Sequence, residues 1–174
     1  MPYYHTDYET ALKLSNSMYQ TDYVQSGLVT GTMWDAMMKF IAGTDDAIVT
    51  TKSSWGNYTN GTVTYTEGKG RYATVDSNSG TTSAFTKSDG SYHYGIKTTA
   101  ISESVKKKNL YDVAGNLWEW TQEVSYLDKN QRFMVRGGSF DHSYIDRPAC
   151  FRSGGIETAG NDTNRGFRPA LYIK

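Results

Sequence analysis

Three short phrases in the C-terminal half of the chain constrain its fold more than any other feature. They read LYDVAGNLWEW over residues 110–120, RGGSF over residues 136–140 and RGFR over residues 165–168. The glycine-asparagine pair at 115–116 is a turn signal, because both residues tolerate positive φ. We therefore expect the core to lie in the stretch from Asn109 to Arg168, around which the rest of the chain is organised.

The first two phrases and their flanks predict β-strands. Trp118, Trp120 and Thr121 lie in an aromatic and β-branched run with two-residue alternation, the pattern of a half-buried strand. A second strand is predicted through Phe133 and Val135, which alternate with Arg and Met residues and precede a glycine pair. Large aromatic side chains with this spacing share one face of a strand, so we expect them in the core.

Two amphipathic helices are predicted in the N-terminal part. The first covers residues 7–19 and follows Thr6 in a capping-box pattern. The second begins after Thr30 or Thr32 and ends at Gly43, a natural C-terminal stop. Its apolar face is interpreted as core packing and consists of Trp34, Met37, Met38 and Ile41.

The segment from Gly43 to Lys108 is dominated by threonine, serine, glycine and asparagine, with aromatic residues at intervals. A structureless loop of this length is uncommon in a compact domain, so we expect short strands around 63–65 and 92–94. The same composition is found in binding loops, where tyrosine supplies rigid contact area. Packing is the favoured interpretation and binding is the alternative. Lysines 106–108 are interpreted as solvated.

Composition and charge limit the classes of function. The length of 174 residues favours one domain, and the 18 basic and 18 acidic residues cancel. A neutral chain has no global field to attract nucleic acid or an anionic membrane. No apolar run approaches the roughly 18 residues of a membrane span, and residues 1–5 lack the features of a signal peptide. Cys150 is the single cysteine, which excludes an intrachain disulfide.

The phrases in this order, together with LVTGTMWD at residues 28–35, resemble the formylglycine-generating-enzyme/sulfatase-modifying-factor family. Within this branch of the C-type lectin fold, these sequence motifs are most similar to those of the variable proteins of diversity-generating retroelements, common in phages and bacteria. The resemblance is dense from Asn109 to Arg168 and looser from Gly27 to Ile41. It implies an α+β fold in which two helices flank small, mostly antiparallel sheets with a long loop-rich insert, and a single domain over residues 1–174.

The last strand is indicated by Phe167, Leu171 and Ile173, with Pro169 better suited to an edge or a bulge. Relatives usually carry, ahead of the first helix, a strand that pairs with this one, whereas this chain starts at the helix. Either the chain is the C-terminal part of a longer protein, or another segment replaces the strand. Without a partner, the edge of residues 171–173 would be exposed unless another chain covered it.

The resemblance also raises the question of whether this chain holds the copper and calcium sites of the family enzymes. Family enzymes use copper held by a pair of cysteines after their RGGSF phrase, and soft thiolates favour Cu(I). Here that segment holds only Cys150, so such catalysis is not expected. Family enzymes also bind calcium near the equivalent of Glu119, for which a structural acceptor role is the favoured alternative. Arg136, Arg165 and Arg168 are interpreted as structural, with Asp112 or Glu119 as partners.

No other catalytic or metal-binding constellation is recognisable. His142 is far in sequence from His5 and His93, without metal-ligand spacing. Ser139 has no Gly-x-Ser-x-Gly context, and Cys150 would need an activating base. The Glu-Pro-Asn and Gln-Pro-Asp motifs of calcium-dependent lectins are absent. We therefore predict no catalytic residue, no metal and no cofactor, and a chain that is not an enzyme.

Residues 139–165 differ in character from the phrases on either side. They contain no Lys, Gln, Met or Trp and a single Glu, Glu157. In the retroelement-linked relatives this is the segment where adenine-directed mutagenesis rewrites Asn-type codons, which cannot become those residues. The bias agrees with such a history, and an ordinary polar loop is the alternative.

These observations predict a non-catalytic ligand- or receptor-binding domain, a hypervariable surface-display or phage receptor-binding protein diversified by a retroelement. The three phrases would form the scaffold that holds its binding loops. For Phe140 and Phe151, burial in the core is the alternative to ligand binding. The predicted ligand-binding residues are Phe140, Asp141, His142, Tyr144, Ile145, Asp146, Arg147, Phe151, Ile156, Asn161 and Asn164.

The expected partner is a protein or a cell-surface ligand, with no nucleic acid and no membrane insertion, and the expected location is the virion or the cell surface. The oligomeric state, the host and the ligand stay open. Two other functions are kept as alternatives, a divergent formylglycine-generating-type enzyme and a structural phage tail or pilus tip module.

Overall fold

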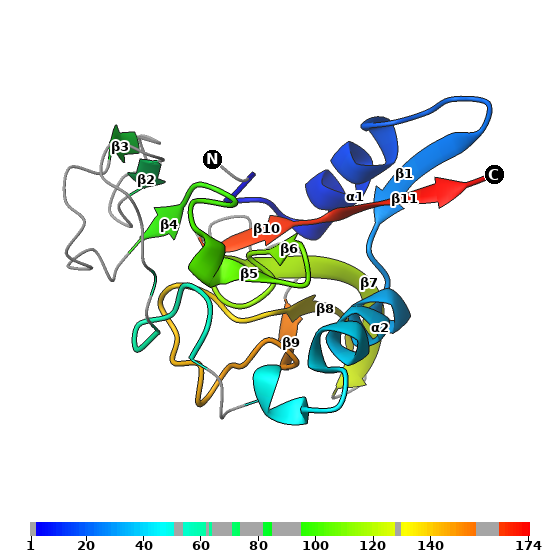
Figure 1. Ribbon diagram of the computed structural model, residues 1–174. Helices are drawn as coiled ribbons and strands as arrows, with labels where there is room; N and C mark the ends of the chain where they lie inside the picture. The colour runs from blue at the N-terminus through cyan, green and yellow to red at the C-terminus, as the bar shows by residue number, and fades with distance from the viewer. Residues whose placement is uncertain are drawn as a thin grey trace.

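The computed structural model describes residues 3–50, 54–61, 63, 71–73, 82–84, 95–127, 130–155 and 164–174. Two α-helices and several small sheets make up this part of the chain, which gives the expected α+β class (Figure 1). Its centre is a four-stranded sheet in the order β10-β7-β8-β9. No helix among the described residues is long and apolar enough to cross a membrane.

The central sheet contains the strands that the phrases predict. β7 (Trp118–Leu127) pairs antiparallel with β8 (Asn130–Arg136), and β8 pairs antiparallel with β9 (Arg152–Gly155). β10 (Arg165–Phe167) runs parallel to β7 on its other side. Trp118 and Trp120 are both buried, which confirms the expectation that this face of β7 belongs to the core.

The turn before β7 also has the predicted backbone. Gly115 and Asn116 have φ values of 69° and 64°, in the left-handed region. A Cβ at Gly115 would lie 2.2 Å from the carbonyl oxygen of Asn57, so only glycine fits there. The buried amide of Asn116 holds the turn, because its Oδ1 accepts from the backbone N–H of Lys97 at 2.8 Å.

Helix α1 (Tyr8–Ser17) is shorter than the expected range of 7–19. Its N-cap is Asp7, whose side chain accepts from the backbone N–H of Thr10 at 2.7 Å, so the prediction of Thr6 as the cap was wrong. Thr6 is instead buried, and its backbone N–H and hydroxyl both face the carbonyl oxygen of Arg165. Tertiary contact with the sheet thus displaces the helix start by one residue.

Helix α2 (Gly31–Ala42) agrees with the sequence in detail. Thr30 is its N-cap and accepts from the backbone N–H of Met33 at 3.1 Å, and Gly43 ends it with a φ of 61°. The expected apolar face is turned inward: Trp34, Met38 and Ile41 are buried, and Met37 packs against them.

A two-stranded ribbon carries the C-terminal end of the described chain away from the body (Figure 1). β1 (Val24–Leu28) pairs antiparallel with β11 (Pro169–Ile173) from Val24↔Ile173 to Leu28↔Pro169. The alternative in which another segment replaces the missing strand is therefore confirmed, because β1, between the two helices, pairs with β11. Leu171 and Ile173 remain exposed on this ribbon, so the last strand contributes less to the core than its apolar pattern suggested.

The described parts of the loop-rich insert form short elements. These are η1 (Asp46–Ile48), β2 (Arg71–Ala73), β3 (Thr82–Ala84), β4 (Ile96–Lys97), η2 (Glu103–Val105), β5 (Lys106–Lys107) and β6 (Leu110–Tyr111). β2 pairs with β3 and β4, and β5 pairs with β6. The strands expected around 63–65 and 92–94 lie, except for residue 63, outside the described residues.

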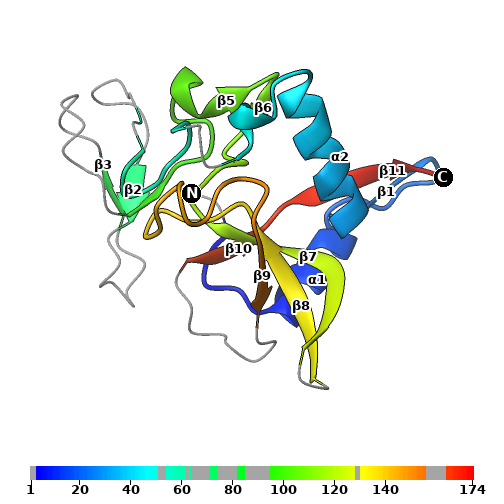
Figure 2. The ribbon, with the colours of Figure 1, turned by 90° about the horizontal axis from the view of Figure 1, so that it is seen from below.

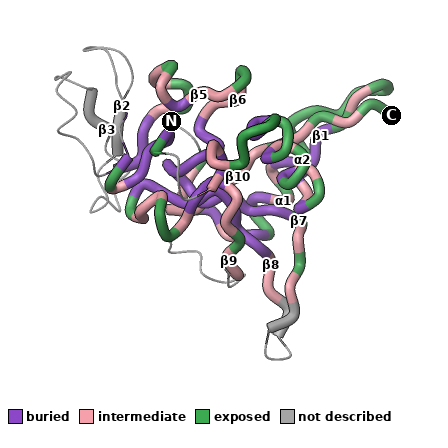
Figure 3. The backbone as a smooth tube through the Cα atoms, turned by 60° about the horizontal axis from the view of Figure 1, so that its bottom comes forward, coloured by how far each residue is buried: buried purple, intermediate pink, exposed green. Residues whose placement is uncertain are grey.

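Two clusters of buried side chains form most of the core. Figure 3 shows the buried residues in purple along the interior of the described chain. The α2 cluster packs helix α2 against the insert and the first phrase, residues 110–120. The sheet cluster packs helix α1 against the central sheet. The α2 cluster consists of Val29, Trp34, Met38, Ile41, Ala42, Val49, Trp55, Tyr58, Val113, Ala114 and Ala149. The sheet cluster consists of Tyr8, Ala11, Leu28, Trp118, Trp120 and Val135.

Candidate functional site

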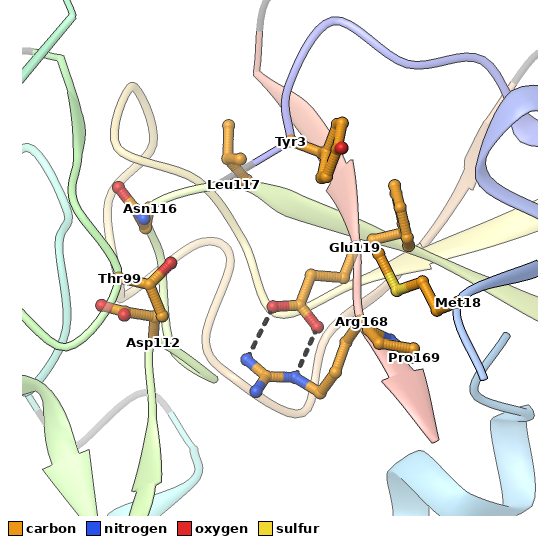
Figure 4. A pocket seen from close by; sticks show the side chains of 10 residues that line it. Tyr3, Met18, Thr99, Asp112, Asn116, Leu117, Glu119, Arg168 and Pro169 are labelled. Atoms are coloured by element: carbon orange, nitrogen blue, oxygen red, sulfur yellow. Dashed lines mark hydrogen bonds and ion pairs between the residues drawn. The ribbon is translucent and has the colours of Figure 1, made fainter. Parts of the chain in front are cut away.

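The first candidate site, the Glu119 cavity, has a volume of about 250 Å³ and surrounds an ion pair (Figure 4). Arg168 donates from Nε and Nη2 to the two carboxylate oxygens of Glu119, at 2.9 and 2.8 Å. Nη2 also donates to the carbonyl oxygen of Tyr111 at 3.0 Å. Glu119 is therefore a structural acceptor, as the sequence favoured, and Arg168 has one of its two predicted partners. The other lining residues are Tyr3, Met18, Thr99, Asp112, Asn116, Leu117, Phe167 and Pro169.

Two buried charges lie beside this ion pair. Burial raises the pKa of Asp112 to about 6, against the opposing effects of a hydrogen bond from the Ala100 N–H and of the Arg168 charge. Burial also lowers the pKa of Lys97 to about 8, and the Asp112 charge opposes that shift. The Lys97 ammonium donates to Asn57 Oδ1. Lys97 therefore supports the turn before β7, because Asn57 in turn donates to Asn116 Oδ1, whereas Asp112 accepts from the Ala100 N–H.

The calcium role that the resemblance implies for Glu119 does not fit these contacts. Calcium takes about six to eight oxygen ligands, whereas both Glu119 oxygens already accept hydrogen bonds from Arg168. Within the part of the chain that the structure describes, no group of three His, Cys, Asp or Glu residues is placed to hold a metal ion.

The copper site of the family enzymes does not fit either. Cys150 is partly buried, and the sequence holds no second cysteine to complete a thiolate pair. Burial raises the pKa of the Cys150 thiol, although Arg136 and Arg152 act in the opposite direction. A protonated, isolated thiol is a poor ligand for copper and a poor nucleophile.

A second cluster of charges lies where β8 and β9 meet helix α2. Arg136 is buried and pairs with Asp35, which also pairs with Arg152. Arg152 Nε reaches Glu123 at 2.8 Å, and the Arg136 guanidinium lies 5.9 Å from the centre of the Trp34 ring. The structural role predicted for Arg136 is confirmed, but its partner is Asp35 and not Asp112 or Glu119.

The predicted ligand-binding segment begins with a hydrogen-bonded turn. Ser139 Oγ donates to Asp141 Oδ1 at 2.5 Å and lies 2.8 Å from His142 Nδ1. Asn164 Nδ2 donates to Asp141 Oδ2 at 2.9 Å, which connects the turn to β10. These residue types occur in catalytic triads, but Ser139 is fully buried, so its hydroxyl cannot attack a substrate.

The other predicted binding residues divide between surface and core. Ile145 is 55% exposed and Asp146 is also exposed. Tyr144 is half-buried, with its ring 6.3 Å from that of Tyr58. Phe140 is 1% exposed and packs with Ile96 and Leu117, so the core alternative holds for this residue and it cannot contact a ligand.

Phe151 is partly buried, packs against the sheet cluster and lies beneath the guanidinium of Arg147, 4.5 Å from ring centre to Cζ. Ile156 and Asn161 lie outside the described residues.

Three of the predicted binding residues, His142, Arg147 and Asn164, line a second cavity of about 230 Å³, the Arg147 cavity. Its strand residues lie at one end of the central sheet. Figure 2 shows that the connection between β8 and β9 lies beside the same end. The lining of the cavity consists of Trp118, Val135, His142, Arg147, Ser153, Asn164 and Arg165.

The four strand residues of this lining share one face of the sheet. Trp118 of β7 pairs with Arg165 of β10, and Val135 of β8 pairs with Ser153 of β9. Trp120 pairs with Val135 and lies two residues from Trp118, which places both pairs on the same side. Sequence reasoning did not assign Ser153 to the site, because only the strand register brings it beside the loop residues.

A family comparison covers most of the chain. The model of the sulfatase-modifying factor enzyme 1-like domain matches residues 36–173, from helix α2 to β11. Comparisons with curated proteins and with solved structures gave no match. The match includes the central sheet, the Glu119–Arg168 ion pair and both cavities except Tyr3 and Met18. The chain therefore belongs to the family of sulfatase-modifying factor enzyme 1-like domains, with their C-type-lectin-like fold.

Proposed function

We propose that this chain is a non-catalytic ligand-binding domain whose binding face surrounds the Arg147 cavity. The supporting observation is the construction of that cavity. Its floor consists of residues from four adjacent strands, whereas His142, Arg147 and Asn164 reach it from the segment between the fixed phrases. Loops held by a rigid sheet are the general arrangement for binding sites, because the scaffold fixes their geometry while their side chains vary.

The absence of catalysis is part of this proposal and is supported by the side chains that a family enzyme would need. Cys150 is the only thiol in the sequence, and burial raises its pKa. Ser139 is fully buried, and the carboxylate of Glu119 is held by Arg168. The residues best suited to chemistry are thus engaged in holding the fold.

We further propose that the domain is displayed on a virion or a cell surface and that a retroelement diversifies residues 139–165. The support is the residue bias of that segment, which lacks Lys, Gln, Met and Trp, together with the contribution of His142, Arg147 and Asn164 to the cavity lining. A reverse-transcriptase gene and a near-repeat of the 3′ end beside this gene would be the expected genomic neighbours. A neighbourhood without both would contradict the retroelement history.

The binding proposal is tested by labelling the purified protein and measuring its attachment to a panel of bacterial cells. Replacing Ile145, Asp146 and Arg147 with serine should abolish attachment while leaving the melting temperature nearly unchanged, because surface substitutions change stability by no more than about 0.5 kcal/mol each. The matched control is Glu9→Ala with Lys13→Ala, on the exposed side of helix α1. Full attachment of the triple-serine protein, or its unfolding, would remove the support for a binding face here.

A further inference from the structure

We infer that the Arg147 cavity binds one acidic sugar unit, with its carboxylate held by arginine and its hydroxyl groups held by the polar rim. This inference rests on the proposed binding function and adds the chemical class of the ligand. It requires no calcium, since neither the sugar-binding motifs of calcium-dependent lectins nor a group of metal ligands among the described residues is found here.

The charge of the lining favours an anion. Arg147 and Arg165 contribute two guanidinium groups to the cavity, and its lining includes no carboxylate among the residues that the structure describes. The nearest acidic side chain of the turn, Asp141, already accepts from Ser139 and Asn164. Among the described residues at this cavity, two guanidinium groups thus outnumber the single neighbouring carboxylate of Asp141, and the excess of positive charge attracts a carboxylate ligand.

Both arginines are positioned by aromatic rings. The Arg147 guanidinium lies 4.5 Å from the centre of the Phe151 ring, and that of Arg165 lies 5.0 Å from a ring centre of Trp120. Arg147 donates one hydrogen bond, to the carbonyl oxygen of Asp146, and pairs with no carboxylate among the described residues. A guanidinium carries five N–H donors in a fixed plane, so Arg147 retains donors suited to two-point contact with a carboxylate.

The rest of the rim suits hydroxyl groups. Ser153 offers a hydroxyl that both donates and accepts, and Asn164 offers an amide. His142 uses Nδ1 toward Ser139 and Asp141, which leaves Nε2 for a ligand. A carboxylate alone would not engage the Ser153 hydroxyl, the Asn164 Oδ1 and the His142 Nε2, whereas a sugar acid supplies several hydroxyl groups next to its carboxylate.

Size and polarity favour a sugar unit over a peptide anchor. The cavity of about 230 Å³ lies below the range of about 300–1,000 Å³ typical of pockets for larger ligands. Its apolar lining consists of Trp118 and Val135, which are both buried. The hot spots of peptide interfaces instead rely on apolar pockets for aromatic anchors.

The test is a titration of the whole chain with D-glucuronate, followed by NMR and repeated with D-glucose, acetate and N-acetyl-L-glutamate. We expect glucuronate to bind at least tenfold more tightly than each of the other three compounds. Arg147→Gln should weaken glucuronate binding at least tenfold. The matched control is Arg132→Gln, because Arg132 lies on β8 outside the cavity lining and should change the affinity less than twofold. Melting curves of both variants verify that each is folded.

Three outcomes would overturn the inference: glucuronate binding no tighter than glucose, N-acetyl-L-glutamate binding as tight as glucuronate, or an Arg147→Gln protein with parental affinity. None of them would by itself overturn the proposed function. If the triple-serine variant lost attachment to cells while glucuronate failed to bind the parent, the binding face would stand and its ligand would belong to another class.

Discussion

Glu119 and Arg168 have little contact with solvent, and each is the charge partner of the other. Their side chains are 10% and 25% exposed, and two hydrogen bonds join them. Glu119→Gln should lower the free energy of unfolding by about 2–4 kcal/mol, because it leaves a mostly buried guanidinium without its countercharge. Urea denaturation at pH 7 measures this loss.

The control for this prediction is Glu103→Gln. Glu103 pairs with Lys106 at the surface, where such pairs contribute little, so this substitution should change the urea midpoint only slightly. A second comparison is Glu119→Gln combined with Arg168→Met, which removes both charges and should recover part of the lost stability. Equal urea midpoints for the Glu119→Gln and Glu103→Gln proteins would show that the buried pair does not contribute more to stability than the surface pair.

Asp112 makes stability depend on pH in a direction opposite to that of most paired carboxylates. Burial raises its pKa from the ordinary value of 3.8 to about 6 in the folded protein. Ionisation is therefore harder in the folded state than in the unfolded state. Ionisation of Asp112 therefore lowers the free energy of unfolding. This loss is absent below pH 4, grows as the pH rises from 4 to 6, and is complete above pH 6.

Asp112→Asn removes this loss while keeping an oxygen that can accept from the Ala100 N–H. The stability of the variant relative to the parent should therefore rise by about 2–3 kcal/mol between pH 4 and pH 7, since one pKa unit corresponds to about 1.4 kcal/mol. Urea denaturation of both proteins at intervals across this range measures the difference. Asp22→Asn, at an exposed position, should show a constant difference. A constant difference for Asp112→Asn as well would contradict the prediction.

At the scale of elements, β7 connects the core to the Arg147 cavity. Trp118 and Trp120 share its buried face, and the Trp120 indole donates to the carbonyl oxygen of Thr6 at 2.7 Å. Replacing either tryptophan with alanine should cost about 3–5 kcal/mol, as for other buried aromatic residues. Val124→Ala on the same strand is the control, because Val124 is 36% exposed. Thermal unfolding within two or three degrees of the parent for both tryptophan variants would contradict this assignment.

The elements that the sequence predicted well are those with strong local signals. Thr30 and Gly43 set the ends of α2 through their own backbone preferences, and the Gly115-Asn116 pair dictates the turn before β7. The alternation through Trp118 and Trp120 needed only the two-residue period of a strand. These features depend on neighbours within a few residues, so a sequence alone contains them.

The features that the sequence did not predict depend on long-range pairing. β1 has the sequence VQSGL, whose weak alternation gives no strand signal, and it becomes a strand because it pairs with β11. The pairing of Arg136 with Asp35 joins residues 101 positions apart. Ser153 enters the Arg147 cavity only through its register with Val135. Local propensity cannot specify such contacts, because the tertiary fold determines them.

At the scale of the whole molecule, direct contacts connect the α2 cluster to the sheet cluster. Arg136 lies next to Val135 of the sheet cluster, contacts the Trp34 ring of the α2 cluster and pairs with Asp35 of the same helix. Leu28 and Val29 are adjacent in the chain, and one belongs to each cluster. We therefore expect residues 1–174 to unfold as one cooperative domain, because neither cluster can lose its packing without exposing the other.

The four tryptophans allow a direct test, because each cluster contains two of them. When tryptophan is excited selectively over the 14 tyrosines, a protein with Trp34→Phe and Trp55→Phe emits only from the sheet cluster, and one with Trp118→Phe and Trp120→Phe emits only from the α2 cluster. Within each variant, the urea midpoint measured by fluorescence should equal that measured by far-UV circular dichroism, which follows the whole chain.

The parent, which reports from both clusters, serves as the control and should give coincident transitions. Both variants will be less stable than the parent, so the comparison is made between the two probes within one protein and not between proteins. A fluorescence transition that precedes or follows the circular dichroism transition in either variant would show that the clusters unfold independently. The chain would then consist of two folding units joined through Arg136, and substitutions near the Arg147 cavity would report on the stability of the sheet cluster alone.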